Sequence, residues 1–248
     1  MISVVIITKN EARVIKECIK SALCLTDDII VLDSGSTDDT IEIATKAGAK
    51  VFSNNWLGFG PQKNLANTYS KYDWILSLDA DERPNQLMIS TLKDLELIND
   101  SIYCFKLVDH FSDRPIRYSE LRPKWKKRLF NKNYVQWDER EVHEQLVFSN
   151  STKLIKCEGL INHFSYTQFS EFEDKISSYA KLGAAEMQKQ NRTLNIIKRI
   201  FNPSFRFFRS YIMYAGFLEG SLGYQISRTL AEGLRIKYRH YDKLMSKK

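Results

Sequence analysis

The sequence predicts an α/β fold: a mostly parallel, Rossmann-like sheet flanked by helices, followed by a helical C-terminal extension. Three observations predict it. Short β-branched runs alternate with segments of helical periodicity over the first half of the chain. Polar residues stand where these runs end. From Phe169 onward, apolar residues recur at helical spacing. We therefore expect an α/β domain over residues 1–165 and a helical extension over 166–248.

The expected elements follow one another as in a doubly wound sheet. Continuous apolar runs predict strands that are buried on both faces, at 3–8, 28–33, 50–52 and 73–79. Helical spacing, cap residues and a final glycine predict helices at 10–23, between 36 and 48, and at 62–69. Pro84 is expected to open a further helix, because proline is favoured in a first helical turn. Mixed strands and loops are expected between 101 and 163, with strand-like runs at 103–108, 127–130 and 160–163.

The net charge of +7 is concentrated at the C-terminal end. Residues 190–248 hold twelve Lys or Arg and three Asp or Glu, whereas residues 1–189 carry a net charge of −2.

The four cysteines form no Cys-x-x-Cys pair, so neither a zinc site nor a redox motif is indicated. No secretory leader is visible, and no apolar run reaches the ~20 residues of a membrane span. We expect a cytoplasmic protein that is soluble or peripherally attached to a membrane.

Three of the predicted strands end on polar residues, namely Thr8, Asp33 and Asp79. Ligands of open α/β sheets bind at the carboxyl ends of the strands. These three side chains should therefore face one crevice.

The segment Asp79-Ala-Asp81-Glu82 offers closely spaced carboxylates directly after a predicted strand. Carboxylate oxygens are preferred ligands of Mg²⁺ or Mn²⁺, and such a metal neutralises a diphosphate. The alternative is a solvated acidic turn that caps the helix expected at Pro84. The position beside two other polar strand ends favours the metal.

The segment 33–38 places an acid at a strand end, before a Gly-containing turn into a helix. This arrangement suits a contact with ribose or base. The alternative is a capping turn with Thr37 or Asp38 as the cap, which would leave Asp33 available. The chain has no Gly-x-Gly-x-x-Gly and no Gly-x-x-x-x-Gly-Lys motif, so neither a dinucleotide-binding fold nor a P-loop is predicted.

Four ordered motifs together resemble family 2 glycosyltransferases with a GT-A fold. They are the segments 5–11, 33–38, 62–64 and 74–82, and their order and spacing match over about residues 1–165. The resemblance implies a donor-binding set of Thr8, Asn10, Glu11, Asp33, Lys63 and Asp79. Glu11 and Asp33 would contact uracil or ribose, and Lys63 would lie near the diphosphate. Asp81 would ligate the metal, and Asp79 would serve ribose or metal.

A narrower likeness is to lipopolysaccharide core β-1,4-glucosyltransferases. It rests on the segments 56–64, 142–144, 163–166 and 216–220. The family often has Asp where Glu219 stands. The likeness implies UDP-glucose as donor and a lipopolysaccharide inner core as acceptor.

An inverting transfer needs a base for the proton of the acceptor hydroxyl. The cluster 138–144 offers four acids and a histidine. We predict Glu144 as the base and Glu141 as the second candidate. The alternative is an exposed charged loop.

His163 follows a short apolar run. The resemblance places it at the metal or the diphosphate, whereas the alternative is a structural histidine. Arg83 and Arg128 are candidates to pair with phosphate, with structural salt bridges as an equal alternative.

The basic tail contains an amphipathic pattern. Phe201, Phe205, Phe208, Ile212 and Ala215 recur at spacings of three and four, which places them on one helical face. A basic helix with aromatic anchors is typical of the surface of an anionic membrane. The alternative is a helix packed on the catalytic domain.

The combined expectation is an inverting, metal-dependent hexosyltransferase that moves glucose from UDP-glucose to a lipid-linked saccharide acceptor. The alternative keeps the fold and takes a polyprenyl lipid, a capsule chain or a protein as acceptor. Nucleic-acid binding through the tail does not account for the polar strand ends of the acidic half and is not expected. A nucleotidyltransferase would carry a Gly-rich basic loop after its first strand, which this chain lacks.

Overall fold

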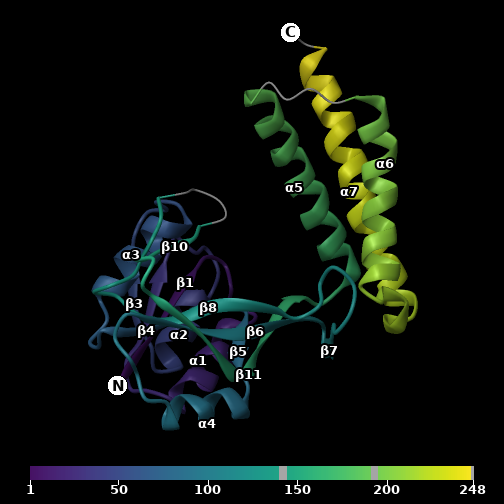
Figure 1. The fold of residues 1–248 in the computed structure, drawn as a ribbon. Helices are drawn as coiled ribbons and strands as arrows, with labels where there is room; N and C mark the ends of the chain where they lie inside the picture. The colour runs from purple at the N-terminus through teal and green to yellow at the C-terminus, as the bar shows by residue number, and fades with distance from the viewer. Residues whose placement is uncertain (140–143, 191–194, 247–248) are drawn as a thin grey trace. The chain divides into compact units, whose positions relative to one another are not determined.

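The computed structural model describes residues 1–139, 144–190 and 195–246. Strands and helices alternate along its first part, and long helices make up its last part (Figure 1). The strands are β1 (Ile2–Thr8), β2 (Ile29–Asp33), β3 (Lys50–Ser53), β4 (Trp74–Asp79), β5 (Glu82–Pro84), β6 (Ser101–Phe111), β7 (Arg114–Pro115), β8 (Lys124–Asn131), β9 (Gln136–Trp137), β10 (Leu146–Val147) and β11 (Lys153–Tyr166). The α-helices are α1 (Ile15–Leu23), α2 (Thr40–Lys46), α3 (Phe59–Thr68), α4 (Gln86–Asp94), α5 (Phe169–Lys189), α6 (Ile196–Phe208) and α7 (Ser221–Met245).

The chain divides into two compact units. The first comprises residues 1–107 and 124–164, and the second comprises residues 108–123 and 165–248. The division at residue 165 that we expected from the sequence assigns 108–123 to the first unit. In the structure this segment contains the end of β6 and the short strand β7, which pair with each other inside the second unit.

The strands that follow the sequence pattern form a parallel sheet in the order β3-β2-β1-β4. Their register places Thr8 opposite Asp33 and Ile7 opposite Asp79. The carboxyl ends of these strands therefore lie together, as expected. The predicted α/β fold, with its parallel strands flanked by helices and its helical C-terminal segment, is confirmed.

The parallel strands continue into an antiparallel part in the order β4-β8-β6-β11-β5. β8 is antiparallel to both β4 and β6, and β5 is antiparallel to β11. Between β6 and β8 the register passes from Tyr103–Leu129 to Cys104–Lys127. Arg128 is therefore the extra residue of a β-bulge, a feature that re-aims side chains.

Alternate residues of the parallel strands enter two apolar cores, one on each face of the sheet. Val4 and Ile6 pack with α1, α2 and α4, whereas Val5 and Ile7 pack with α3 and the hairpin of β9 and β10. This explains why these strands read as continuous apolar runs instead of alternating with polar residues.

Two expected helix starts are wrong. Pro84 ends strand β5, where it pairs with Ile161, and α4 begins only at Gln86. Asn85 caps that helix, because its side chain accepts a hydrogen bond from the Met88 N–H at 2.9 Å. The first helix begins at Ile15, because Asn10 has a left-handed backbone (φ 55°).

In the second unit, α7 packs against both α5 and α6. α6 passes into a π-helical turn at Arg209–Met213, and a short 3₁₀-helix follows at Gly216–Glu219. Ala215 adopts a left-handed conformation (φ 52°) between them, so it does not extend the helical face that we predicted through Phe208 and Ile212. In the described part of the chain, no helix has the length and apolar character that a membrane span needs.

Candidate active site

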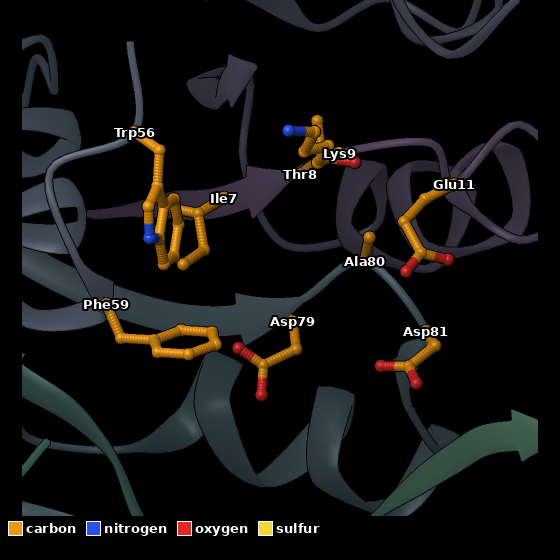
Figure 2. A pocket seen from close by; sticks show the side chains of 9 residues that line it. All are labelled: Ile7, Thr8, Lys9, Glu11, Trp56, Phe59, Asp79, Ala80 and Asp81. Carbon is orange, nitrogen blue, oxygen red and sulfur yellow. The ribbon is translucent and has the colours of Figure 1, made fainter. Parts of the chain in front are cut away.

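A cavity of about 380 Å³ opens at the carboxyl ends of β1 and β4 (Figure 2). It is lined by Ile7, Thr8, Lys9, Glu11, Trp56, Phe59, Asp79, Ala80 and Asp81. The rings of Trp56 and Phe59 stand at one side of the view, Glu11 and Asp81 at the other, and Asp79 lies between them. The cavity thus combines apolar ring surfaces with a few converging acids, a pattern typical of small-molecule sites.

Asp79 is held between two cations. Its carboxylate lies 3.3 Å from the Lys63 ammonium and 3.3 Å from the Arg128 guanidinium. Desolvation would raise the pKa of Asp79, but Lys63 and Arg128 outweigh it and hold this pKa well below its ordinary value. Asp79 is therefore an anion at the centre of the site.

Glu82 differs from its two acidic neighbours. Its side chain is fully buried, contacts the Arg128 guanidinium and accepts a hydrogen bond from the Asp79 N–H at 3.1 Å. Burial raises the pKa of Glu82 to about 7, with Arg128 opposing the shift and Asp79 adding to it. Glu82 therefore stabilises the turn at Asp79 through the hydrogen bond to the Asp79 N–H. Its sequence neighbourhood gives no sign of this, because the partner Arg128 comes from the distant bulge in β8.

Asp81 and His163 lie side by side, with Asp81 Oδ2 3.1 Å from His163 Nε2. The pairing of β5 with β11 brings them together, since His163 is opposite Glu82 and the Phe164 N–H donates to the Asp81 carbonyl. No group of three or more His, Cys, Asp or Glu gathers as a metal site among the described residues. Mg²⁺ at nucleotide sites takes only one or two protein carboxylates, and phosphate and water oxygens complete its shell. Asp81 supplies one such carboxylate, and His163 would add an imidazole nitrogen.

Lys63 connects Asp79 to Glu144. It is 3% exposed, and its ammonium lies 2.8 Å from Glu144 Oε1 and 4.6 Å from the Trp137 ring centre. Asn64, the next residue of α3, exchanges two hydrogen bonds with the Trp137 backbone. The structure thus brings the predicted base Glu144 to the strand ends. The second candidate, Glu141, lies outside the described residues.

The loop after β2 uses the polar groups of residues 33–38 locally. Asp33 is fully buried, and its Oδ2 accepts hydrogen bonds from the Gly35 and Ser36 N–H groups at 2.8 Å each. Asn10 Oδ1 accepts one from the Thr37 N–H at 2.8 Å. Asp33 and Asn10 therefore shape the loop, and neither is among the residues that line the cavity.

Arg83 is also not among the lining residues. Its guanidinium lies over the Phe164 ring, 4.1 Å from the ring centre. The predicted residues that line the cavity itself are thus Thr8, Glu11, Asp79 and Asp81. Trp56 and Phe59 had no assigned role, although their place in the 56–64 motif is the signal that could have indicated one.

A second cavity of about 530 Å³ shares Asp79 with the first. It is lined by Lys63, Asp79, Trp125, Lys126, Lys127, Arg128, Trp137, Glu144, Gln145 and Leu146. Asp79 therefore separates two neighbouring spaces, with Glu144 in the second.

Residues 3–153 match the family model for glycosyl transferase family 2. The chain belongs to this family. Its similarity to known members extends over nearly the whole sequence. An uncharacterized glycosyltransferase of Rickettsia conorii is 30% identical, over 99% of this chain and 92% of the relative. The lipopolysaccharide core biosynthesis glycosyltransferase LpsC of Rhizobium meliloti is 27% identical, over 90% of this chain and 87% of the relative.

A similar solved structure is glucosyl-3-phosphoglycerate synthase from Mycobacterium tuberculosis, crystallised with Mn²⁺ and UDP-glucose. It is 29% identical and aligns with a TM-score of 0.38, over 44% of this chain and 44% of that one. This family 2 chain therefore spans less than half the length of that structure. The resemblance drawn from the four motifs is confirmed at the level of the family, and the chain is a glycosyltransferase that acts on a sugar donor.

Proposed function

We propose that the chain is an inverting, metal-dependent hexosyltransferase that uses a UDP-sugar, with UDP-glucose as the expected donor. The observation that carries the proposal is the arrangement around Asp79. This ionised carboxylate separates a cavity with aromatic and acidic walls from a second cavity that holds a base candidate. Two such spaces suit a donor and an acceptor that must meet at one point.

The first cavity offers contacts for each part of a nucleotide sugar. The rings of Trp56 and Phe59 provide apolar surface for the base, and Glu11 accepts hydrogen bonds from base or ribose. Beside this cavity, the Lys63 ammonium lies 3.3 Å from Asp79 on the side of the second cavity, where it would be near the diphosphate. Asp81 and His163 would hold Mg²⁺ or Mn²⁺, which when bound neutralises the diphosphate and helps it leave.

Glu144 is the proposed base. The acceptor hydroxyl attacks the anomeric carbon of the donor sugar, and its proton passes to a carboxylate oxygen of Glu144. The bond from the anomeric carbon to the diphosphate oxygen breaks, and UDP leaves with the bonding electrons. Attack from the second cavity meets the carbon on the face opposite to UDP, so the configuration inverts. The ammonium of Lys63 fixes the Glu144 carboxylate at that boundary.

The test of the donor assignment is a screen of nucleotide sugars with Mn²⁺ or Mg²⁺, with released nucleotide as the readout. We expect slow hydrolysis of a UDP-hexose, loss of that hydrolysis with EDTA and recovery on adding metal. Asp81→Asn should weaken Mn²⁺ binding to the UDP complex by about tenfold or more, a change of about 1.4 kcal/mol. Binding of neither UDP nor any nucleotide sugar by the wild-type chain would overturn the proposal.

For the acceptor, we propose a lipid-linked saccharide, such as a lipopolysaccharide inner core, held at a membrane. The support comes from α6, whose polar side faces inward. Arg199 contacts Asp242 of α7, and the Asn202 amide donates to the Tyr238 hydroxyl at 2.9 Å. Its apolar side is exposed, with Phe201 at 59% and Phe205 at 41%. A helix that packs through its polar side and exposes aromatic rings is suited to a membrane surface.

The names of two relatives agree with a lipid-borne acceptor. One is LpsC, a lipopolysaccharide core biosynthesis enzyme, and the other is a cholesterol galactosyltransferase of Borreliella burgdorferi that is 23% identical over 99% of this chain. The proposed setting is the inner face of the cytoplasmic membrane. Anionic lipid there would attract the +9 charge of residues 190–248. A polyprenyl lipid, a capsule chain or a protein as acceptor is the competing outcome of an acceptor screen.

A further inference from the structure

The second cavity contains more positive than negative charge. Two of its cations are neutralised within the site, because Lys63 pairs with Asp79 and Glu144 and Arg128 pairs with Asp79 and the buried Glu82. The other two are Lys126 and Lys127, which precede the bulge in β8.

Lys126 and Lys127 form no ion pair within the described part of the chain. The Lys127 ammonium lies over the Phe148 ring, 4.4 Å from its centre. The side chain of Lys126 is exposed at the cavity wall. Desolvation by the surrounding cavity and the neighbouring guanidinium of Arg128 lower its pKa. Two adjacent cations without an acid are thus held beside a third, an arrangement that an anion would stabilise.

Two further lysines lie beside Trp125, outside the second cavity. The Trp125 ring also lines a neighbouring cavity of about 400 Å³, together with Lys106 and Lys156. The ammonium groups of Lys106 and Lys156 lie 5.3 Å and 5.4 Å from the Trp125 ring centre. Neither of them forms an ion pair among the described residues. Within the described residues, lysines without ion pairs therefore line both of the cavities that share Trp125.

We propose that the second cavity binds the acceptor saccharide through an anionic group, a phosphate or a carboxylate, which contacts Lys127 and Lys126 beside Trp125. This inference rests on the proposed function and specifies the chemistry of its acceptor. The anionic group fixes the sugar in the cavity, so that a free hydroxyl points toward Glu144 and the donor at Asp79. A neutral sugar lacks this contact and binds more weakly.

The experiment uses the wild-type chain saturated with UDP and Mn²⁺, so that the first cavity is filled and a phosphate cannot bind there. Glucose 6-phosphate, glucuronate and glucose are titrated separately, and tryptophan fluorescence reports binding. At least one anionic probe should bind about tenfold more tightly than glucose, a difference of about 1.4 kcal/mol. The stronger of the two anionic probes identifies the group as phosphate or carboxylate.

Single variants connect the effect to the two lysines. Lys127→Gln and Lys126→Gln should each raise the dissociation constant of the preferred anionic probe several-fold, with little effect on glucose. Lys127→Arg keeps the charge and should retain most of the affinity. Lys93→Gln removes an exposed lysine from the last turn of α4 and should change nothing. Circular dichroism and melting temperature verify that each variant is folded.

The outcomes separate the two proposals. Equal affinity for all three probes, binding of none of them, or an unchanged preference in a folded Lys127→Gln protein would overturn the anionic acceptor alone. Failure of the wild-type chain to bind UDP in the saturation step would instead contradict the proposed function.

Discussion

Glu144 is the residue on which the proposed chemistry depends most directly. Its carboxylate lies 2.8 Å from the buried Lys63 ammonium at the boundary of the two cavities. Glu144→Gln preserves the size of the side chain and removes the proton acceptor. We expect the transfer rate to fall by about 10²–10⁴-fold, the typical contribution of a general base. Single-turnover transfer with a bound UDP-sugar measures this effect, and UDP titration verifies that the donor site is intact. A variant that binds donor and retains full turnover would exclude Glu144 as the base.

Glu120 stabilises the second unit through its contacts with two arginines. Its carboxylate accepts hydrogen bonds from Arg206 at 2.8 Å and from Arg209 at 3.2 Å. Burial would raise its pKa, but the two guanidinium groups outweigh burial and lower it. The pKa is thus lower in the folded chain than in the unfolded chain. Glu120 therefore stabilises the fold fully above the unfolded value of about 4.3, and this contribution is lost as the pH falls through the folded value.

The variant Glu120→Gln tests this pH dependence. At neutral pH we expect the free energy of unfolding to fall by about 2 kcal/mol, the scale of a hydrogen bond to a charged group. The difference from wild type should shrink below about pH 4.3, where the unfolded carboxyl is protonated. Thermal melts from neutral to acid pH measure it. Glu173→Gln, an exposed position of α5 in the same unit, is the control. A difference that stays constant at acid pH would contradict the ion pairs as its source.

The sequence predicted the residues that local pattern determines. Thr8 and Asp79 could be placed because a run of apolar residues ends at each of them, and the register of parallel strands then brings them to one edge. Burial of Glu82 beneath Asp79 could not be predicted, because its partner Arg128 depends on a bulge that forms only when β6 and β8 pair. The contact of Asp81 with His163 likewise requires β5 to pair with β11.

At the scale of elements, helix α3 carries Lys63 and fits closely against the chain after β9. A Cβ atom on Gly60 would lie 1.8 Å from the Asp138 carbonyl oxygen. Gly60→Ala must therefore push α3 away from β9 and shift Lys63, one turn further along. We expect a loss of about 1–3 kcal/mol in the free energy of unfolding, the usual cost of overpacking. The hydrolysis of a UDP-sugar, measured as released UDP, should also become slower.

A glycine in another helix serves as the control for Gly60→Ala. A Cβ on Gly183 of α5 would contact only the flexible end of the Lys237 side chain, at 3.1 Å and beyond. Gly183→Ala should therefore be neutral or slightly stabilising, because alanine favours helix more than glycine does. Thermal denaturation and nucleotide release are compared for both variants. Equal stability of the two would contradict the close contact of α3 with Asp138.

The elements show which local signals were misleading. Proline at 84 favours a helix start, yet the residues before it complete a strand, since the backbone of β5 bonds to β11. The helical spacing after Asn10 begins too early, because Asn10 adopts a left-handed turn that binds the loop after β2. In both cases a contact with a distant segment decides the outcome, and the local pattern does not contain it.

At the scale of the whole molecule, the two features on which the proposals depend lie in different units. The strand ends of the first unit gather the acids, and the second unit exposes apolar side chains on α6. Periodicity predicted an amphipathic helix but could not show which of its faces is packed. The structure answers this through the bonds of Arg199 and Asn202 to α7, which direct the polar face inward.

The exposed side of α6 leads to a prediction about membrane binding. The Phe201 and Phe205 rings stack at 5.5 Å, and both are exposed, so their replacement should not disturb the packing of α6 on α7. Burying one Phe side chain contributes about 1.5–3 kcal/mol. Phe201→Ser with Phe205→Ser should therefore weaken sedimentation with vesicles of phosphatidylcholine and phosphatidylglycerol by about a hundredfold or more.

The design of this measurement separates the apolar from the electrostatic contribution. Leu182→Ser, at an exposed position of α5, should leave vesicle binding unchanged. Raising the salt concentration should weaken the wild-type protein on anionic vesicles, because the charge of residues 190–248 is then screened. The apolar contribution should persist in salt and vanish only in the phenylalanine variant. If the double variant and wild type sediment equally at low salt, α6 does not insert, and the proposed membrane contact of Phe201 and Phe205 is wrong.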